Sequence, residues 1–201
     1  MSNRLYFKYG VMGSGKTTEL LQIAHDYELA NKRVGIFKPQ VDTKGDKYIV
    51  SRMANLHRQT SLLPIDFHEF DKNIFNHDVI LIDEAQFLTK EYVEYFLDFA
   101  HRYDVPILCF GLRTTFDGEP FEGASHLFAL ADSVEEISTR AICKICNDQL
   151  STKNLRLVDG EPTFDGDTVV IDNQNQDIKY IPVCSQDFMA LKRSKMKEQL
   201  K

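Results

Sequence analysis

Short apolar runs alternate along the first two thirds of the chain with segments in which apolar residues recur at helical spacing. Continuous apolar runs indicate strands that are covered on both faces, and four occur: LYFKYG (5–10), RVGIFKP (33–39), HDVILID (77–83) and DVPILCFG (104–111). Helical spacing extends from Lys16 to about Asn31, and again from Thr89, a typical N-cap, to about Tyr103. This alternation predicts an α/β fold with a parallel sheet and helices on both faces.

Two regions depart from the alternation. Residues 40–60 are polar and show no clear period, which predicts a mobile loop. Beyond about residue 141, short β-like pieces (NLRLV, DTVVI and KYIPVC) stand between turn signals, and a basic segment typical of a solvated helix or frayed tail follows. We therefore expect two domains, an α/β domain at 1–140 and a small β lobe with a C-terminal helix at 141–201. So small a lobe often needs a bound metal.

Composition narrows the class of protein. The chain has 201 residues and a formal net charge of -6, which argues against a broad nucleic-acid-binding surface. It lacks an apolar run of about 18 residues and the features of a signal peptide, so we expect no membrane partner and a cytoplasmic location. A disulfide framework is then not expected, and Cys109, inside an apolar run, is expected to be a core residue.

One motif carries the clearest chemistry. The segment Gly10-Val11-Met12-Gly13-Ser14-Gly15-Lys16-Thr17 matches G-x-x-x-x-G-K-[ST], follows a predicted strand and opens a predicted helix. Its glycines let backbone N–H groups turn toward phosphate oxygens, and the helix N-terminus adds partial positive charge. We expect Lys16 to reach the β- and γ-phosphates and the Thr17 hydroxyl to bind Mg²⁺. A chance glycine turn, the competing interpretation, would not need this context.

An acidic pair, Asp83-Glu84, ends one of the apolar strands. In a P-loop fold an aspartate on another strand completes the Mg²⁺ site, and we expect this of Asp83. Glu84 would stand at the carboxyl edge of the sheet, where ligands bind, and could accept a proton from an attacking hydroxyl. Without the P-loop, such a pair would usually be a solvated turn.

Several longer segments resemble the thymidine kinases of the cellular, bacterial and phage type (type II). They occur in the family's order and cover nearly the whole chain: GVMGSGKTTELL, KPQVDTK, DEAQF, PILCFGLRTTFDGEPFEG, the C-x-x-C at 143–146, and YIPVC. The resemblance implies a RecA-like P-loop sheet with a small zinc-ribbon-like lobe and a lasso loop. It implies transfer of the γ-phosphoryl of ATP, with Mg²⁺, to the 5′-hydroxyl of thymidine or deoxyuridine. A homotetramer and feedback inhibition by dTTP are also implied.

The resemblance assigns roles to individual residues. Glu84 matches the family's catalytic base. ATP binding is implied for residues 10–17 and for Asp42, Lys44, Asp83 and Gln86. The residues implied to line the nucleoside pocket are Met12, Phe87, Leu112, Phe116 and Phe121. Aromatic faces stack a base for about 1–3 kcal/mol, although each aromatic residue taken singly would be a plain core residue.

A second part of the pocket is implied by TVVIDNQNQDIKYIPVC, which resembles the loop that folds over the nucleoside. Its residues Val169, Val170, Ile171 and Asp172 match main-chain groups that read the base edge, and Tyr180 matches a tyrosine that contacts substrate. Where the family has VVIGG this chain has VVIDN, and losing both glycines restricts the backbone.

Cys143-x-x-Cys146 and Cys184 match three ligands of the family's structural zinc site. The second ligand pair is usually Cys-x-x-His or Cys-x-x-Cys, whereas this chain has Cys184-Ser-Gln-Asp187. Aspartate binds zinc at about 2.0–2.2 Å, but structural sites favour Cys and His. Three outcomes stay open: zinc with Asp187 as fourth ligand, zinc with another fourth ligand, and a lost site in which Asp187 only begins the last helix.

Two other functions use the same motifs. A RecA-like nucleic-acid-linked ATPase would use Glu84 to activate water, but the acidic net charge and the aromatic segment 110–121 speak against it. A non-catalytic nucleotide sensor would not need Lys16, Thr17, Asp83 and Glu84 together.

Overall fold

The protein consists of two compact units. The computed structural model describes residues 4–41, 48–51, 56–71, 76–137, 141–168 and 177–199. The first unit comprises Met1–Tyr9, Gly15–Arg113 and Phe121–Ile137, and the second comprises Gly10–Ser14, Thr114–Pro120 and Ser138–Lys201. The division into two contiguous domains at 1–140 and 141–201, which the sequence led us to expect, remains a prediction. Within the described ranges, no helix has the length and apolar character needed to cross a bilayer.

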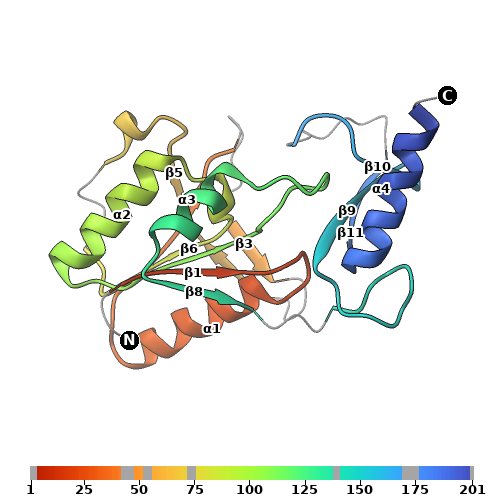
Figure 1. Cartoon of the computed structure of the whole chain (residues 1–201). Coiled ribbons are helices and arrows are strands. Elements are labelled where there is room, and N and C mark those ends of the chain that lie inside the picture. Colours follow the sequence, from red (N-terminus) through yellow and green to blue (C-terminus); the bar gives the residue numbers. More distant parts are fainter. Residues whose placement is uncertain are drawn as a thin grey trace. The chain divides into compact units, whose positions relative to one another are not determined.

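A six-stranded sheet forms the centre of the first unit, and every neighbouring pair of its strands is parallel (Figure 1). The strands, in the order β5-β2-β6-β7-β1-β8, are β5 (Ser61–Leu63), β2 (Val34–Pro39), β6 (Val79–Ile82), β7 (Ile107–Gly111), β1 (Leu5–Tyr9) and β8 (Ser133–Glu136). The predicted α/β fold with a parallel sheet is confirmed. Because the strands are parallel, the loops that leave the carboxyl ends of β6 and β7 meet at one edge.

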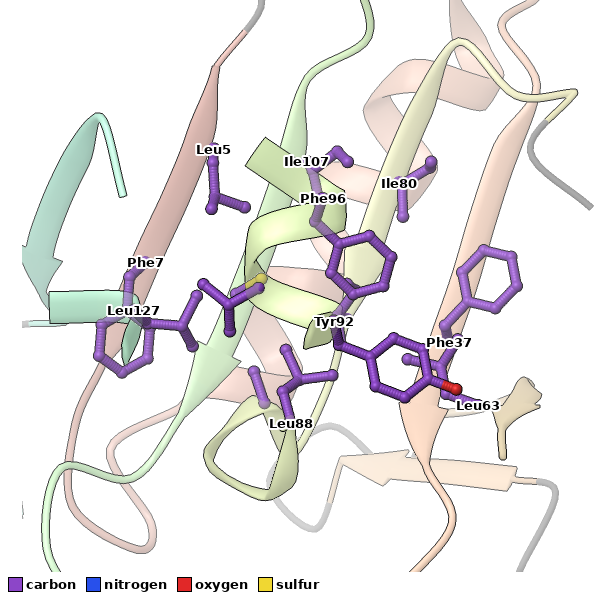
Figure 2. Packing of buried hydrophobic residues seen from close by; sticks show 14 of the residues in the cluster. Leu5, Phe7, Phe37, Leu63, Ile80, Leu88, Tyr92, Phe96, Ile107 and Leu127 are labelled. Atoms are coloured by element: carbon purple, nitrogen blue, oxygen red, sulfur yellow. The ribbon is translucent and has the colours of Figure 1, made fainter. Parts of the chain in front are cut away.

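Helices cover both faces of this sheet because its central strands are apolar on both sides. In β6, Ile80 and Ile82 belong to one apolar cluster and Val79 and Leu81 to the other, and all are fully buried. Figure 2 shows the first cluster, to which α2 contributes Tyr92 and Phe96. The predicted helices are confirmed as α1 and α2. Among the described residues of this unit, the helical elements are α1 (Lys16–Leu29), η1 (Phe67–Glu69), η3 (Ala85–Phe87), α2 (Lys90–Tyr103) and α3 (Glu122–Leu130).

Cys109 lies in β7 with its side chain fully buried in the first cluster. Burial raises the pKa of its thiol, because the apolar surroundings disfavour the thiolate. The expected core role of this cysteine is confirmed.

The loop expected at residues 40–60 is wrong in part, because two strands lie within it. β3 (Tyr48–Ser51) and β4 (Leu56–Gln59) pair antiparallel, whereas residues 42–47 and 52–55 lie outside the described ranges. Ile49 is buried against the apolar cluster of α1, and Arg58 donates two hydrogen bonds, of 2.9 and 2.8 Å, to Glu28 of that helix. The hairpin thus depends on contacts with α1 that the local pattern does not reveal.

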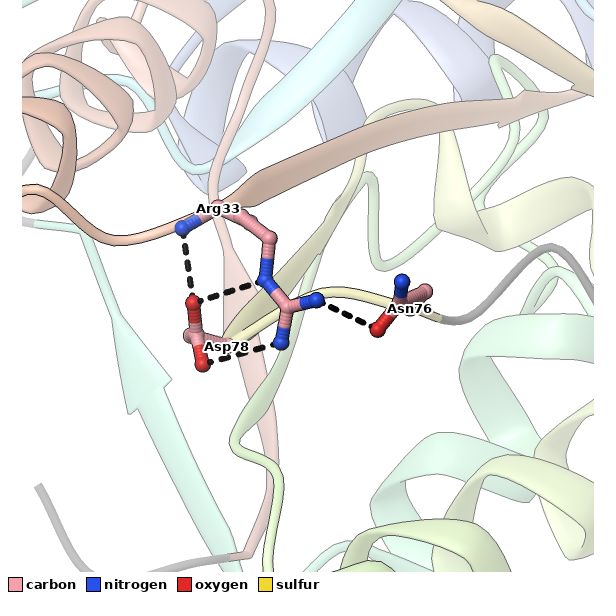
Figure 3. A network of polar contacts seen from close by, with 3 residues as sticks. All are labelled: Arg33, Asn76 and Asp78. Carbon is pink, nitrogen blue, oxygen red and sulfur yellow. Dashed lines mark hydrogen bonds and ion pairs between the residues drawn. The ribbon is translucent and has the colours of Figure 1, made fainter.

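Arg33 links the starts of two neighbouring strands (Figure 3). It precedes β2, and its backbone N–H and Nε donate to Oδ2 of Asp78, just before β6, at 2.8 and 3.2 Å. Another guanidinium N–H donates to Oδ1 of Asn76. These bonds from Arg33 lower the pKa of the Asp78 carboxyl. Since the group is exposed, we expect it to fix the alignment of β2 with β6 more than to add stability.

In its described residues, the second unit contains a three-stranded antiparallel sheet and one helix. Its elements are β9 (Lys153–Val158), β10 (Glu161–Thr163), β11 (Ile178–Val183) and α4 (Ser185–Gln199), with the strand order β10-β9-β11. The strands predicted in NLRLV and KYIPVC are confirmed as β9 and β11, and the terminal helix as α4, while DTVVI extends beyond the described residues. The buried core is small and includes two cysteines: Cys143, Leu155, Val183, Cys184 and Phe188.

Candidate functional site

The loop between β1 and α1 has the backbone conformation that its glycines allow. Gly13 and Gly15 have φ angles of 75° and 93°, in a region that side chains other than glycine rarely adopt. The N–H of Ser14 donates to the carbonyl of Val11 at 3.1 Å, which closes a tight turn. α1 then begins at Lys16, so a helix N-terminus follows the loop directly, as anion binding requires.

Lys16 and Thr17, in the first turn of α1, lie beside the carboxylates that follow β6. The Thr17 hydroxyl donates to Oδ2 of Asp83 at 3.3 Å. Burial lowers the pKa of Lys16, and the charges of Glu84 and Asp83 oppose this by favouring the ammonium form. The structure therefore brings together Lys16, predicted to bind phosphate, Thr17 and Asp83, predicted to bind Mg²⁺, and Glu84, predicted to be the base.

Asp83 is a buried carboxyl that contacts the Thr17 hydroxyl. Burial, and then the charge of Glu84, raise its pKa to about 6, whereas the backbone N–H of Glu84 and the charge of Lys16 act in the opposite direction. A hydroxyl and a carboxylate in contact are the hard oxygen donors that Mg²⁺ prefers, and a cation there would relieve the cost of the buried charge. The donor set at Thr17 and Asp83 thus fits Mg²⁺.

Glu84 is exposed and occupies a strained backbone position. Its φ of 53° and ψ of 35° place it in the left-handed region, immediately before η3. Non-glycine residues adopt this conformation at a cost of about 1–3 kcal/mol, and such strain is concentrated at functional sites. The conformation turns the chain sharply where β6 ends, so Asp83 is buried while the next side chain reaches solvent.

Gln86 holds the Glu84 carboxylate in place. Its side chain is almost fully buried; Nε2 donates to Oε2 of Glu84, and Oε1 accepts the backbone N–H of Leu112 at 2.9 Å. A Cβ at Gly111 would lie 2.9 Å from the same Oε1, so this glycine leaves room for the amide. The sequence predicted ATP binding for Gln86 but not this orienting contact; a glutamine two residues after the acidic pair is the signal that could have suggested it.

The predicted nucleoside-pocket residues divide between the two units. In the first unit, the rings of Phe87 and Phe121 meet edge to face, 5.5 Å apart. In the second unit, Met12 and Phe116 both contact β9, as described below. Leu112 is buried in the first unit, and Tyr180 is half-buried in β11 of the second. The remaining predicted residues lie outside the described ranges: Asp42, Lys44, Val169, Val170, Ile171 and Asp172.

Cys143, Cys146, Cys184 and Asp187 form one cluster in the second unit. Their potential ligand atoms all lie within 4.8 Å of one another. Oδ2 of Asp187 accepts hydrogen bonds from the Cys143 and Cys184 thiols at 3.1 and 3.3 Å, and these thiol contacts lower the pKa of its carboxyl. Three thiols and one carboxylate that converge in this way fit a four-coordinate Zn²⁺ site.

Comparison with known proteins agrees with this site. Residues 3–188 match the model of a family described as thymidine kinase. The chain is 40% identical over 188 residues to a thymidine kinase of Streptococcus gordonii, and the aligned region covers 92% of this chain and 95% of that protein. It is 34% identical over 194 residues to a thymidine kinase of Lactobacillus acidophilus (90% and 94%), and 34% over 186 residues to one of Chromobacterium violaceum (92% and 97%).

Proposed function

The chain belongs to the thymidine kinase family and phosphorylates thymidine, and we propose that it transfers the γ-phosphoryl group of ATP with the residues of the site described above. The donor is ATP with Mg²⁺, and the acceptor is the 5′-hydroxyl of thymidine or deoxyuridine, which supplies dTMP or dUMP for DNA synthesis. The observation that carries the proposal is the arrangement of Lys16 and Thr17 beside Asp83 and the Gln86-held Glu84.

The phosphate side of the reaction belongs to α1 and the end of β6. Lys16 contacts the β- and γ-phosphates, and the Thr17 hydroxyl and the Asp83 carboxylate hold Mg²⁺. When bound, Mg²⁺ neutralises charge that develops on the transferring phosphoryl group. Lys16 adds a fixed positive charge in a half-buried place, where electrostatic attraction is stronger than in water.

The acceptor side belongs to Glu84. Its exposed carboxylate accepts the proton of the 5′-hydroxyl as the oxygen attacks the γ-phosphorus, and Gln86 keeps it in the required orientation. Phe87 and Phe121 offer aromatic surface for the pyrimidine. The roles expected for Met12, Phe116 and Tyr180 in the nucleoside pocket are part of the same proposal.

In the second unit, Zn²⁺ is proposed to be structural, with Asp187 as its fourth ligand. The cluster supports this interpretation over a lost site, because Asp187 does more than begin α4: its carboxylate faces two of the three thiols. When bound, Zn²⁺ would join the C-x-x-C turn to the start of α4. The core of this unit is too small to hold these segments firmly by itself.

The competing ATPase is not favoured by the comparisons, since the relatives reported above are thymidine kinases. The homotetramer, inhibition by dTTP and the cytoplasmic location remain proposals that follow from the family.

The function is tested by incubating the protein with ATP, Mg²⁺ and, separately, thymidine, deoxyuridine, deoxycytidine, deoxyadenosine and deoxyguanosine. We expect kcat/KM for thymidine and deoxyuridine to exceed that for the purines by about 100-fold or more, since a site that pairs with a base edge rejects bases that cannot match it. Equal turnover of deoxyadenosine would contradict the proposal. DNA-stimulated hydrolysis of ATP without nucleoside phosphorylation would establish the ATPase instead.

The metal centre is tested by Asp187→Ala. We expect the wild type to contain one zinc ion per chain, and the variant to bind zinc at least about tenfold more weakly in competition with a chromophoric chelator, because a structural site needs four ligands. Asp148→Ala is the matched control, since this exposed carboxylate lies in the turn after Cys146 outside the cluster. Unchanged affinity in Asp187→Ala would assign the fourth position to another ligand, and a zinc-free wild type would mean a lost site.

A further inference from the structure

Two polar side chains are buried on one face of β9, the central strand of the small sheet. Asn154 is 4% exposed and Arg156 is 3% exposed. Alternate residues of a strand share a face, so both stand opposite Leu155, which packs into the core around Cys143 and Cys184. Burying an amide, and above all a guanidinium, is unfavourable unless the group has polar or aromatic partners. The partners of these two side chains therefore indicate their structural role.

Arg156 lies between an aromatic ring and a loop. Its guanidinium carbon is 3.5 Å from the centroid of the Phe116 ring, which is a stacking contact. Its terminal N–H groups donate to the backbone carbonyls of Asp167, at 2.8 Å, and of Asp165. Within the described residues Arg156 forms no ion pair, and its buried Nε has no hydrogen-bond partner. The ring face and two carbonyl dipoles therefore compensate its charge.

The loop is shaped to fit the guanidinium. Gly166 stands between the two accepting carbonyls and has a φ of 102°, and a Cβ there would lie 2.9 Å from a terminal nitrogen of Arg156. Glycine is thus needed at this position both for its backbone angle and for space. On the other side of Arg156, Tyr180 of β11 is its direct cross-strand neighbour.

The segment that carries Phe116 has separate supports for its backbone. The ammonium group of Lys192 in α4 donates to the carbonyl of Asp117 at 2.6 Å, and Gly118 packs closely against the ring of Phe188. These contacts hold the backbone of the turn at Asp117 and Gly118. The Phe116 ring itself is 3% exposed, and the guanidinium of Arg156 covers one of its faces.

We propose that Arg156 is a positioning residue for the nucleoside. It fixes the Phe116 ring against the loop at 164–168, which continues in the chain into the segment expected to read the base. The inference rests on the proposed function, because it takes Phe116 to be part of the nucleoside pocket. Arg156 touches neither ATP nor the reacting atoms in this proposal, so its loss should appear in the KM for thymidine and not in the KM for ATP.

The test uses Arg156→Met and Arg156→Lys in the full-length, zinc-loaded protein. Arg156→Met should raise the KM for thymidine by about 10- to 100-fold, with kcat and the KM for ATP changed by less than about threefold. The KM of Arg156→Lys for thymidine should lie between those of the wild type and Arg156→Met, because lysine keeps the charge but lacks the planar fork that reaches two carbonyls. Arg193→Met, an exposed arginine of α4 in the same unit, should leave both KM values unchanged.

Hydrogen exchange separates the possible outcomes. In the wild type, thymidine should slow amide exchange at residues 114–120, and this protection should be lost in Arg156→Met while exchange in β9 stays unchanged. If thymidine gives no protection there in the wild type, the proposed pocket is wrong. If protection occurs but both variants keep the wild-type KM for thymidine, the positioning role is wrong. Parallel increases in both KM values with faster exchange throughout the sheet would make Arg156 a merely structural residue; should Arg156→Met not fold, Arg156→Lys decides alone.

Discussion

Replacing Glu84 by glutamine is expected to lower kcat for thymidine phosphorylation by about 10²- to 10⁴-fold, the range that a general base contributes. Glutamine has the same shape, and its side-chain oxygen can still accept the hydrogen bond from Nε2 of Gln86. The orienting contact between Gln86 and the backbone of Leu112 is also unchanged. What is lost is the capacity to take up the proton of the 5′-hydroxyl, so the loss should appear in kcat with thymidine and not in the binding of ATP.

Steady-state kinetics and a direct ATP-binding measurement check this expectation. The matched control is Glu94→Gln, which removes an exposed carboxylate of α2 that pairs only loosely with Lys90, at 3.5 Å. We expect this control to match the wild type. A Glu84→Gln variant that kept kcat within about threefold of the wild type would exclude Glu84 as the base, since so small an effect is below any general-base contribution.

The central sheet could be predicted because its inner strands are apolar on both faces. β6 and β7 are fully buried, and continuous apolar runs of this kind have few other stable arrangements. The edge strands were not predicted, because SLL in β5 and SVEE in β8 are short and partly exposed and exist through their pairing with β2 and β1. The β3–β4 hairpin was missed for a related reason, since its support comes from α1.

The site shows the same division between local and distant information. The P-loop and the acidic pair are local patterns with a fixed spacing, so the sequence alone identified Lys16, Thr17, Asp83 and Glu84. The orienting groups are different, because each is held by or contacts a partner far away in the chain. Gln86 is held by the N–H of Leu112, Asn154 accepts the N–H of Met12 at 2.8 Å, and Arg156 stacks on Phe116. The sequence alone does not show which distant residues meet in this way.

Replacing Lys16 by methionine is expected to lower kcat by about 10²- to 10³-fold, the usual effect of removing one electrostatic contact to the transition state. Methionine fills a similar apolar volume, so the buried stem of the side chain is largely replaced while the charge is lost. A second effect follows from Asp83, whose pKa burial and Glu84 raise to about 6 and which Lys16 lowers. Without Lys16 this pKa rises further, and a larger fraction of Asp83 is protonated near neutral pH and cannot hold Mg²⁺.

The residual activity of Lys16→Met should therefore increase more steeply between about pH 6 and pH 8 than that of the wild type, because deprotonation of Asp83 is completed at higher pH. Kinetics at a fixed, subsaturating Mg²⁺ concentration across this range measure both effects, because excess Mg²⁺ would displace the proton from Asp83. Lys16→Arg should recover the pH profile better than the rate, since it restores a charge near Asp83 but not the compact ammonium group. Lys90→Met, an exposed lysine of α2, is the control. Full activity in Lys16→Met would show that Lys16 makes no contact that stabilises the transferring phosphoryl group, and the proposed role of Glu84 would then lose the support of its position beside Lys16.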